Sequence, residues 1–463
     1  MTFGQQHFGG LDLGDARRER RLPELVDAMH KHPGGTLPDK LSEPRELRAF
    51  YRMMNAEDVT HQAVLSGHYR VTREAIAEAA GATVLILQDA TEWDYTSRTT
   101  LIDDLGQIGQ GTSRGDICHN SLAVRADTKA TLGLTSQILH HRADVPKNET
   151  AKECRERANR ESRLWVKGAT QSGPLPPVGL VVDVSDSLSD TFEYMAYEIE
   201  AGRQFVLRSK ENRKLVEPIN GEHSLHDAVR TKRSVLEWDH AVPAKPGRKA
   251  RNAHLKMSFT TVTLNLPVKR AGEYANEPLT LWAIRVWEPN PPAGEEALEW
   301  ILLTNVAVNT PEEARERVAW YECRFVIEEF HKGLKTGCGI ELLQFTTIDG
   351  LEPVIGVLSV LTTTLLNLRD AARAPNADTR PASDVVSQEY IDVLVRHYST
   401  RLGGFVSVKA FYLHVARLGG HQNRKCDGFP GWITLWRGWM KLESMALGYR
   451  LAKRKQQSTC GKT

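Results

Sequence analysis

The first 80 residues show a helical spacing of apolar positions. A run of basic residues begins at Arg17, and the apolar residues behind it recur three or four positions apart, as on one face of an α-helix. These apolar residues are Leu22, Leu25, Val26 and Met29. A second run of this kind covers 43–54. The pattern predicts helical structure from about residue 11 to residue 80.

Short runs rich in β-branched residues follow this helical part. Residues 83–87 form an apolar run that ends in Gln88 and Asp89, which predicts a buried strand with an acid at its carboxyl end. Further strands are expected at 121–125, 132–139 and 179–184. The polar residues 145–170, between these runs, are expected to be helical.

The second half of the chain changes character twice. It is β-rich over about 205–305, which predicts a β insertion or subdomain, and a helix is expected from about residue 311 to residue 335. The apolar residues 354–368 predict a buried core helix, because they fall short of the roughly 20 apolar residues that a membrane span needs. A linker rich in Ala, Pro, Asp and Arg covers 371–385. The last segment is helical, and one face carries Trp432, Trp436 and Trp439.

Length and composition narrow the class of protein. A chain of 463 residues has room for about two to four domains, and its 41% hydrophobic and 25% charged residues are typical of a soluble globular protein. The amino terminus has no basic stretch followed by an apolar one, so a signal peptide is not expected. The six cysteines form no CxxC pair, which argues against a zinc site or a disulfide framework. We therefore expect a cytoplasmic protein with reduced thiols.

The formal net charge of +2 conceals an uneven distribution. Residues 201–256 carry a net charge of +7 and residues 401–463 a net charge of +10, so the remainder is acidic. Basic segments of this kind suit a polyanion such as DNA, although a solvated basic surface has the same composition. A near-neutral total therefore does not exclude a nucleic-acid enzyme.

The helix expected at 311–335 carries the strongest chemical signal. At 100° per residue, one of its faces collects a phenol, a guanidinium, a carboxylate and two ammonium groups. These groups belong to Tyr321, Arg324, Glu328, Lys332 and Lys335. One interpretation is an exposed face with ion pairs between successive turns. The other is catalytic, because Glu328 and two acids at strand ends would supply the three carboxylates of a divalent-metal phosphoryl-transfer site.

The spacing of these residues resembles a signature of the DDE cut-and-paste transposases of the insertion sequence 4 family, in the branch that includes the transposase of transposon five. That signature is Tyr, two residues, Arg, three residues, Glu, six residues and Lys, and 321–335 contain it without a gap. Asp89 corresponds to the first acid of the family, with Ala90 in place of a Thr. Residues 8–18 resemble the end-binding segment, and 416–420 with the tryptophans that follow resemble the dimerisation region.

The second acid has three candidates, Asp183, Asp186 and Asp190. Residues 189–194 match the aromatic-acidic end of the family pattern, which identifies Asp186 as the counterpart of the second acid. Ser187 stands where the family has Arg, and Asp183 remains the alternative. As a strand residue, Asp183 would otherwise face a polar neighbour.

The resemblance implies an α/β fold with a ribonuclease-H-like mixed-sheet catalytic core and a β-rich insertion, flanked by helical amino- and carboxyl-terminal domains. The expected DNA-end-binding domain covers 1–75. The catalytic core covers 76–375, with the insertion at about 205–305. The carboxyl-terminal dimerisation domain covers 376–463.

The same resemblance implies a DNA transposase that binds inverted repeats at transposon ends. It would cut both strands through a hairpin intermediate and join the 3′ ends to target DNA as a homodimer. Asp89, Asp186 and Glu328 would hold two Mg²⁺ ions, for which Mn²⁺ substitutes. One ion would activate the attacking water or 3′-hydroxyl, and the other would stabilise the leaving oxygen. No membrane partner is expected.

DNA contacts are expected from several parts of the chain. Trp300 would stack on a base flipped out of the duplex, which supplies roughly 1–3 kcal/mol, whereas a tryptophan of the β core is the alternative. The other expected DNA contacts are Arg17, Arg18, Arg21, Arg208, Lys210, Tyr321, Arg324, Lys332 and Lys335. We expect His119 and His331 to be structural.

Two other functions fit parts of the sequence. A non-transposing nuclease on the same fold would cut DNA with Mg²⁺ without forming a hairpin or a joined product. A catalytically inactive, domesticated DNA-binding protein would bind DNA and leave it intact. The presence of all three acids argues against the second of these.

Overall fold

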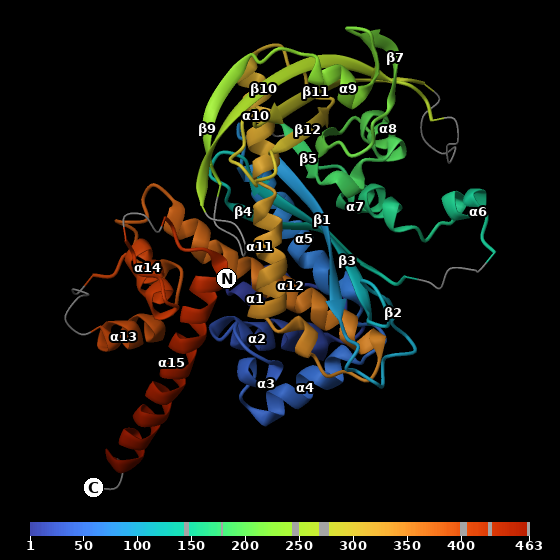
Figure 1. The fold of residues 1–463 in the computed structure, drawn as a ribbon. Helices are drawn as coiled ribbons and strands as arrows, with labels where there is room; N and C mark the ends of the chain where they lie inside the picture. Colours follow the sequence, from blue (N-terminus) through green and yellow to red (C-terminus); the bar gives the residue numbers. More distant parts are fainter. Residues whose placement is uncertain are drawn as a thin grey trace.

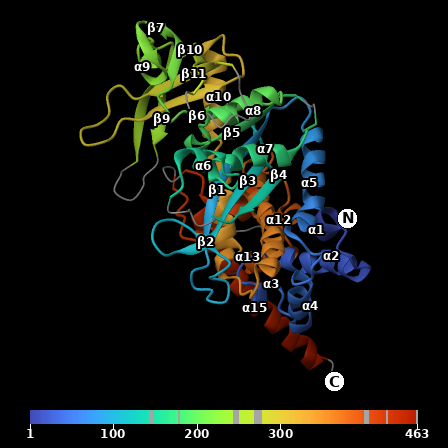
Figure 2. The same cartoon turned by 90° about the vertical axis from the view of Figure 1, so that its right-hand side faces the viewer.

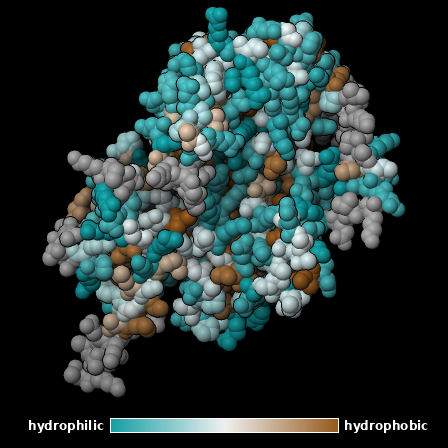
Figure 3. Space-filling view, viewed as in Figure 1, coloured by the Kyte–Doolittle hydropathy of each residue, from teal (hydrophilic) through white to brown (hydrophobic). Residues whose placement is uncertain are grey.

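The computed structural model describes residues 1–142, 148–176, 179–242, 250–267, 277–398, 405–424 and 428–460, without the side chains of Ala151, Arg155 and 454–460 (Figure 1). The basic segments 201–256 and 401–463 therefore lie partly outside the described residues, and Cys426 lies outside them. The protein is a mixed α/β structure with one large mixed sheet and flanking helices. Figure 3 shows one face, which is largely hydrophilic with small separate apolar patches.

A group of helices precedes the sheet. They are α1 (Phe3–Phe8), α2 (Ala16–Lys31), α3 (Leu37–Lys40), α4 (Pro44–Met54) and α5 (His61–Glu78). Polar side chains fix two of their starts, because Asp15 and Thr60 accept hydrogen bonds from backbone N–H groups in the first turns of α2 and α5. The helical expectation for this part is confirmed, and the expected second helix is α4.

The sheet has the strand order β2-β3-β1-β5-β6-β12-β11-β10-β7-β8, with β4 paired to β3 and β9 paired to β10. The strands of its first half are β1 (Val84–Asp94), β2 (Gly106–Gln107), β3 (Arg114–Arg125), β4 (Thr131–His140), β5 (Val181–Ser185) and β6 (Gln204–Arg208). Strand β3 is antiparallel to β1 and β4, whereas β1, β5 and β6 are parallel to one another.

The β-rich segment extends this same sheet. Its strands are β7 (Lys214–Ile219), β8 (Glu222–Ser224), β9 (Leu236–Val242), β10 (Arg251–Leu264), β11 (Leu279–Trp287) and β12 (Glu299–Thr304). The link to the core is the antiparallel pairing of β12 with β6, so the expected insertion is not a separate sheet. Figure 2 shows it at the opposite side of the molecule from α1 and α2.

Strand β1 is longer than its apolar run predicts. It continues to Asp94, because β3 pairs with it as far as Gly115. Asp89 therefore lies in the middle of a strand, opposite Asn120, and the expected strand end at Asp89 is wrong. In contrast, Asp186 directly follows the end of β5.

The two faces of the sheet are covered by different helices. Side chains alternate between the faces along each strand. Leu87, Val184 and Val206 share one apolar cluster with residues of α11 and α12. Phe205 and Leu207 belong to a second cluster, with residues of α7 (Leu164–Ser172) and α8 (Phe192–Glu200), on the opposite face.

The single helix expected at 311–335 is divided. It consists of α10 (Pro311–Glu322), α11 (Phe325–Lys332) and a π-helical turn, η3 (Gly333–Gly337). The division falls at Cys323 and Arg324, where the N–H groups of Val326 and Ile327 bond to carbonyls three residues earlier, a tighter turn than an α-helix makes. Figure 1 shows α10 and α11 following each other across the sheet.

The expected core helix is α12 (Ile348–Arg373). By length and composition it could cross a membrane, but 83% of its most apolar window is buried inside the protein, which confirms the core position. The remaining helices are α6 (Ala151–Glu156), α9 (Leu225–Arg230), α13 (Gln388–His397), α14 (Val408–Leu418) and α15 (Trp432–Cys460), with short turns η1 (Glu161–Arg163), η2 (Ser187–Ser189), η4 (Ile340–Leu342) and η5 (Ala382–Asp384). Trp432, Trp436 and Trp439 are buried, and α15 extends beyond the body of the molecule (Figure 1).

Candidate active site

Asp89 and Asp186 lie next to each other on adjacent strands. In the β1–β5 register Leu87 is opposite Val184 and Gln88 is opposite Ser185, so one further step places Asp186 beside Asp89. Both acids share the face of Leu87 and Val184, which α11 and α12 cover. The sheet therefore brings the first two expected acids together.

Arg324 connects these acids to Glu328. Its Nη1 lies 3.3 Å from Asp89 Oδ2, and its Nη2 lies 3.2 Å from Glu328 Oε1. Asp186 also acts on Arg324 electrostatically. The Asp89 and Arg324 side chains are 14% and 15% exposed, whereas Glu328 is 48% exposed. The division between α10 and α11 thus places a guanidinium among the three expected carboxylates.

Asp89 has a perturbed acidity. Burial and, to a smaller extent, the nearby Asp186 carboxylate raise its pKa to about 6, against the opposing effects of Arg324 and the N–H of Ala90. Two neighbouring, partly buried carboxylates repel each other, so keeping both ionised costs free energy unless a cation lies beside them. This combination is typical of functional sites.

We expect Asp89→Asn to stabilise the metal-free protein at pH 8. The folded-state pKa of Asp89 lies above the unfolded value of 3.8, so the folded state binds the proton more tightly and ionisation costs stability as the pH rises from about 4 to about 6. Asn avoids that cost, which gives a gain of about 1–3 kcal/mol at pH 8 and less near pH 4. Urea unfolding in EDTA at both pH values measures the difference; a gain that does not change with pH would contradict the shift.

The three carboxylates fit Mg²⁺ by chemistry and charge. Mg²⁺ prefers oxygen ligands and keeps several waters, so a few carboxylates suffice. Among the described residues, no three His, Cys, Asp or Glu side chains already stand close enough to hold a metal ion. Arg324 lies between Asp89 and Glu328, so shared coordination by these two carboxylates requires its guanidinium to move aside.

Arg208 and Tyr321 border the acids. Arg208 ends β6 opposite Leu302 of β12, and its Nη2 donates a hydrogen bond of 3.3 Å to the carbonyl of Glu299. Burial raises the pKa of Tyr321, which Arg208 and Arg324 partly offset. Both residues therefore lie within the neighbourhood of Arg324, as their expected role requires.

The remaining expected contacts are spread around this neighbourhood. Trp300 is half-buried on the face of β12 that carries Leu302, with its ring edge-on to His240 at 6.3 Å. Lys335 pairs with Glu341 at 3.3 Å. Lys210 and Lys332 are exposed.

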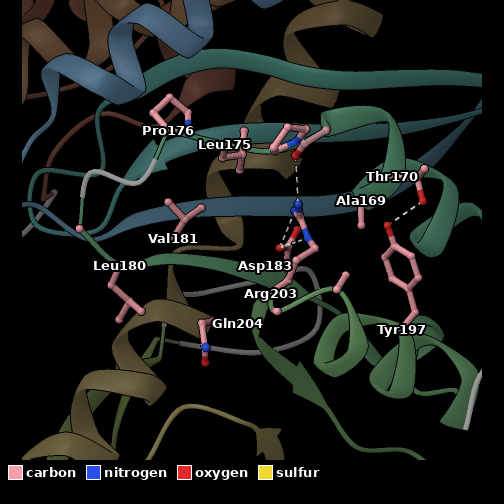
Figure 4. Close-up of a pocket in the computed structure, with 15 residues that line it drawn as sticks. Ala169, Thr170, Leu175, Pro176, Leu180, Val181, Asp183, Tyr197, Arg203 and Gln204 are labelled. Carbon is pink, nitrogen blue, oxygen red and sulfur yellow. Dashed lines mark hydrogen bonds and ion pairs between the residues drawn. The ribbon is translucent and has the colours of Figure 1, made fainter.

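Asp183 belongs to a different cluster on the other face of the sheet. Its Oδ2 accepts hydrogen bonds of 3.1 and 2.7 Å from Nε and Nη2 of Arg203, and its Oδ1 accepts one of 2.7 Å from Gln88. Figure 4 shows Asp183 and Arg203 in a pocket of about 640 Å³. None of the described residues that line it is Asp89, Asp186 or Glu328.

Asp190, the third candidate, anchors the chain after β6. It accepts hydrogen bonds from the N–H groups of Lys210 and Glu211 at 2.6 and 2.8 Å and from Nη1 of Arg213 at 2.5 Å. Its side chain is fully buried. Of the three candidates for the second acid, only Asp186 lies on the face and at the register position of Asp89.

The expected DNA contacts on α2 are engaged in ion pairs. Arg17 pairs with Asp15 at 3.0 Å, and Arg18 pairs with Asp58 at 3.1 Å. Arg21 pairs with Glu24 and Glu46. Several cations of the basic segment 201–256 are likewise paired: these are Arg203, Arg213, Arg230, Arg251 and Lys256.

Helix α4 carries a basic stripe that the sequence reasoning missed. Arg45, Arg48 and Arg52 lie on one face of the helix, opposite the buried Phe50 and Met54. All three are exposed, and their side chains form no ion pair or hydrogen bond with any described residue. The arginine spacing of three and four residues was the available signal.

The amino-terminal helices, including α4, also match a known protein family. Residues 1–59 match the family model described as transposase DNA-binding. The matched residues include α1 to α4 and end just before α5. This match supports a DNA-binding transposase.

Proposed function

We propose that the chain is a DDE transposase of the insertion sequence 4 type that cuts DNA at the Asp89, Asp186 and Glu328 site. The observation that carries the proposal is the meeting of these three acids around Arg324, in a chain whose first 59 residues match a transposase DNA-binding family. The proposed DNA enzyme acts in the bacterial cytoplasm.

The strand order supports a ribonuclease-H-like core. The sequence β4-β3-β1-β5-β6 places three antiparallel strands beside two parallel ones, with the first strand at the centre. In open α/β sheets, functional groups gather at carboxyl ends of strands near a change in strand order. Asp186 follows β5 at such an end, next to β1.

The side chains of the site divide the work of phosphoryl transfer. Asp89, Asp186 and Glu328 would hold the Mg²⁺ ions, which when bound promote attack on the phosphodiester and stabilise the leaving oxygen. Arg324 is placed to exchange its carboxylate partners for a DNA phosphate, since its planar fork suits either group. Tyr321 and Arg208 would hold neighbouring phosphates, which orients the strand for attack.

The finer steps rest on the family resemblance together with exposure. Lys210, Lys332 and Lys335 are proposed backbone contacts. Trp300 is half-buried, so its exposed part is open to a flipped base during a hairpin step. The synaptic homodimer, the use of two Mg²⁺ or Mn²⁺ ions and transfer into target DNA belong to the same proposal.

We expect the α4 arginines to carry end binding. Replacing Arg45, Arg48 and Arg52 together by Gln should weaken binding to the end repeat and reduce the slope of log K against log salt by roughly 2–3, because each lost phosphate contact removes about 0.9. Fluorescence anisotropy over a salt series measures the slope. The matched control, Gln at Arg17, Arg18 and Arg21, should change the slope less, since those cations are already paired. Equal slope changes in the two triples would contradict the assignment to α4.

One gel experiment separates the proposed function from the alternatives. Purified protein is incubated with DNA that carries its own terminal repeats, with Mg²⁺ or with EDTA. The proposal predicts nicks at the repeat, a hairpin and joined product with Mg²⁺ only. Cutting without hairpin or joining indicates a non-transposing nuclease, and binding without cutting indicates an inactive DNA-binding protein. Trp300→Ala should spare the nick and weaken the hairpin step.

A further inference from the structure

A row of buried polar side chains crosses the sheet at the level of the candidate acids. Asn120 of β3 is opposite Asp89, and Gln137 of β4 is opposite Asn120. Asn120 and Gln137 are fully buried. Beyond β4 the row reaches His61, the first residue of α5, and at its inner end it reaches His331 of α11.

The hydrogen bonds of this row all point the same way. His61 Nε2 contacts Gln137 Oε1 at 3.0 Å, and Gln137 Nε2 donates to Asn120 Oδ1 at 2.7 Å. Asn120 Nδ2 contacts His331 Nε2 at 3.1 Å. An amide oxygen only accepts, so His61 must present Nε2–H to Gln137; an amide nitrogen only donates, so His331 must accept at Nε2 from Asn120.

Burial keeps both histidines in the form that this direction needs. It lowers the pKa of His61 to about 4 and that of His331 to about 3, so both rings are neutral at pH 7. Gln137 Nε2 also donates to Ser359 Oγ of α12 at 2.9 Å. The row thus joins α5, the sheet, α12 and α11 through hydrogen bonds between buried side chains.

We propose that Gln137 and Asn120 are positioning residues that hold α11, and with it Glu328, at the correct place beside Asp89. His331 lies three residues after Glu328, on the buried side of the same helix, and its partner Asn120 is the strand neighbour of Asp89. The Asn120–His331 bond therefore ties α11, which carries Glu328, to β3, the strand that pairs with β1 at Asp89. The functional part of the inference rests on the proposed metal-dependent cleavage.

At its other end, the row reaches the start of α5, close to the segment that matches the DNA-binding family. His61 begins α5 two residues after the end of the 1–59 match. The same hydrogen bonds therefore hold the helix after the DNA-binding part and the helix of the third acid against one sheet. Buried networks of this kind fix one arrangement when every member is satisfied.

The test uses substitutions that change hydrogen bonding at nearly constant volume. Gln137→Glu keeps an acceptor for His61 and loses the donor to Asn120 and Ser359. His331→Leu removes the acceptor at α11, whereas His331→Gln keeps one near the position of Nε2. The matched control is Asn305→Asp, an amide-to-acid change that loses the hydrogen bond donated to the carbonyl of Arg203 and keeps the one accepted from the N–H of Phe205.

The first readout needs no activity. Amide hydrogen exchange of the metal-free protein should speed up about tenfold over 325–332 in Gln137→Glu and His331→Leu, because an unmade buried hydrogen bond weakens local closure. His331→Gln and Asn305→Asp should leave exchange in α11 as in wild type. Unchanged exchange in both Gln137→Glu and His331→Leu would overturn the positioning role, whatever the protein does to DNA.

The second readout connects the row to the site. In the full-length protein with its end-bearing DNA, Gln137→Glu should raise the Mg²⁺ concentration for half-maximal cleavage about tenfold, with end affinity unchanged. Should Gln137→Glu fail to fold, His331→Leu against His331→Gln decides the same question. Faster exchange in α11 with wild-type Mg²⁺ dependence would limit the row to stability and overturn the link to Glu328. Absence of cleavage by the wild type would instead refute the proposed function.

Discussion

Asp186→Asn is expected to abolish DNA cleavage while end binding persists. The change removes one carboxylate from the candidate metal site and keeps the side-chain volume, so cleavage should fall on the order of a thousandfold or more. Asp183 is the matched control, because it lies three residues earlier in the chain and its side chain lies on the opposite face of the sheet. Asp183→Asn should retain cleavage, since Asp183 lies on the other face of the sheet, where it pairs with the buried Arg203.

The pair of variants distinguishes a catalytic role from a structural one. Single-turnover cleavage of end-bearing DNA and urea unfolding of the same two preparations provide the four measurements. The reverse pattern, an active Asp186→Asn and a stable but inactive Asp183→Asn, would assign the second acid to Asp183. Asp190 offers a further control, because its buried contacts to Arg213 and to the backbone after β6 predict a loss of stability.

Arg369→Met is expected to destabilise the protein by about 3–5 kcal/mol. Arg369 is 1% exposed on α12 and forms ion pairs with Glu329 of α11 and with Asp370. Asp370 in turn accepts a hydrogen bond of 2.8 Å from the N–H of Thr131 on β4. Removing the cation leaves Glu329 buried without its partner, which costs far more than the intact pair contributes.

The double variant Arg369→Met with Glu329→Met is the control for this interpretation. It should recover most of the lost stability, because two well-packed apolar side chains often replace a buried ion pair at little cost. Urea unfolding of the two single variants and the double variant measures the coupling. Additive losses would show that the ion pair is not the source of the effect. Glu329 directly follows Glu328, so Arg369→Met should also disturb the placement of that acid.

Local patterns in the sequence predicted which helices and strands exist better than they predicted where these elements end. The apolar run at 83–87 identified β1, but the strand extends to Asp94 because of its long-range pairing with β3, which no local window contains. The helix at 311–335 has a continuous helical pattern. Its division at Cys323 and Arg324, which brings Arg324 between two carboxylates distant in the sequence, is not visible in that pattern.

The candidate site depended on which face each residue occupies. Three acids compete between 183 and 190, and their spacing alone cannot decide among them. The strand period of two and the β1–β5 register place Asp186 beside Asp89 and turn Asp183 towards Arg203. Likewise, the basic run of α2 is conspicuous in the sequence, but the ion pairs of Arg17, Arg18 and Arg21 form only in the folded protein. The exposure of the α4 arginines is also a property of the fold.

The metal specificity of a variant at Asp186 shows whether Asp89, Asp186 and Glu328 hold the divalent ions that cut DNA. Asp186→Cys replaces a hard oxygen donor by a thiolate, which suits Mg²⁺ poorly and Mn²⁺ better. We expect this variant to cleave DNA in Mn²⁺ and little or not at all in Mg²⁺, while the wild type cleaves in both. Cleavage by Asp186→Cys in Mg²⁺ at the wild-type rate would contradict this role of the three acids.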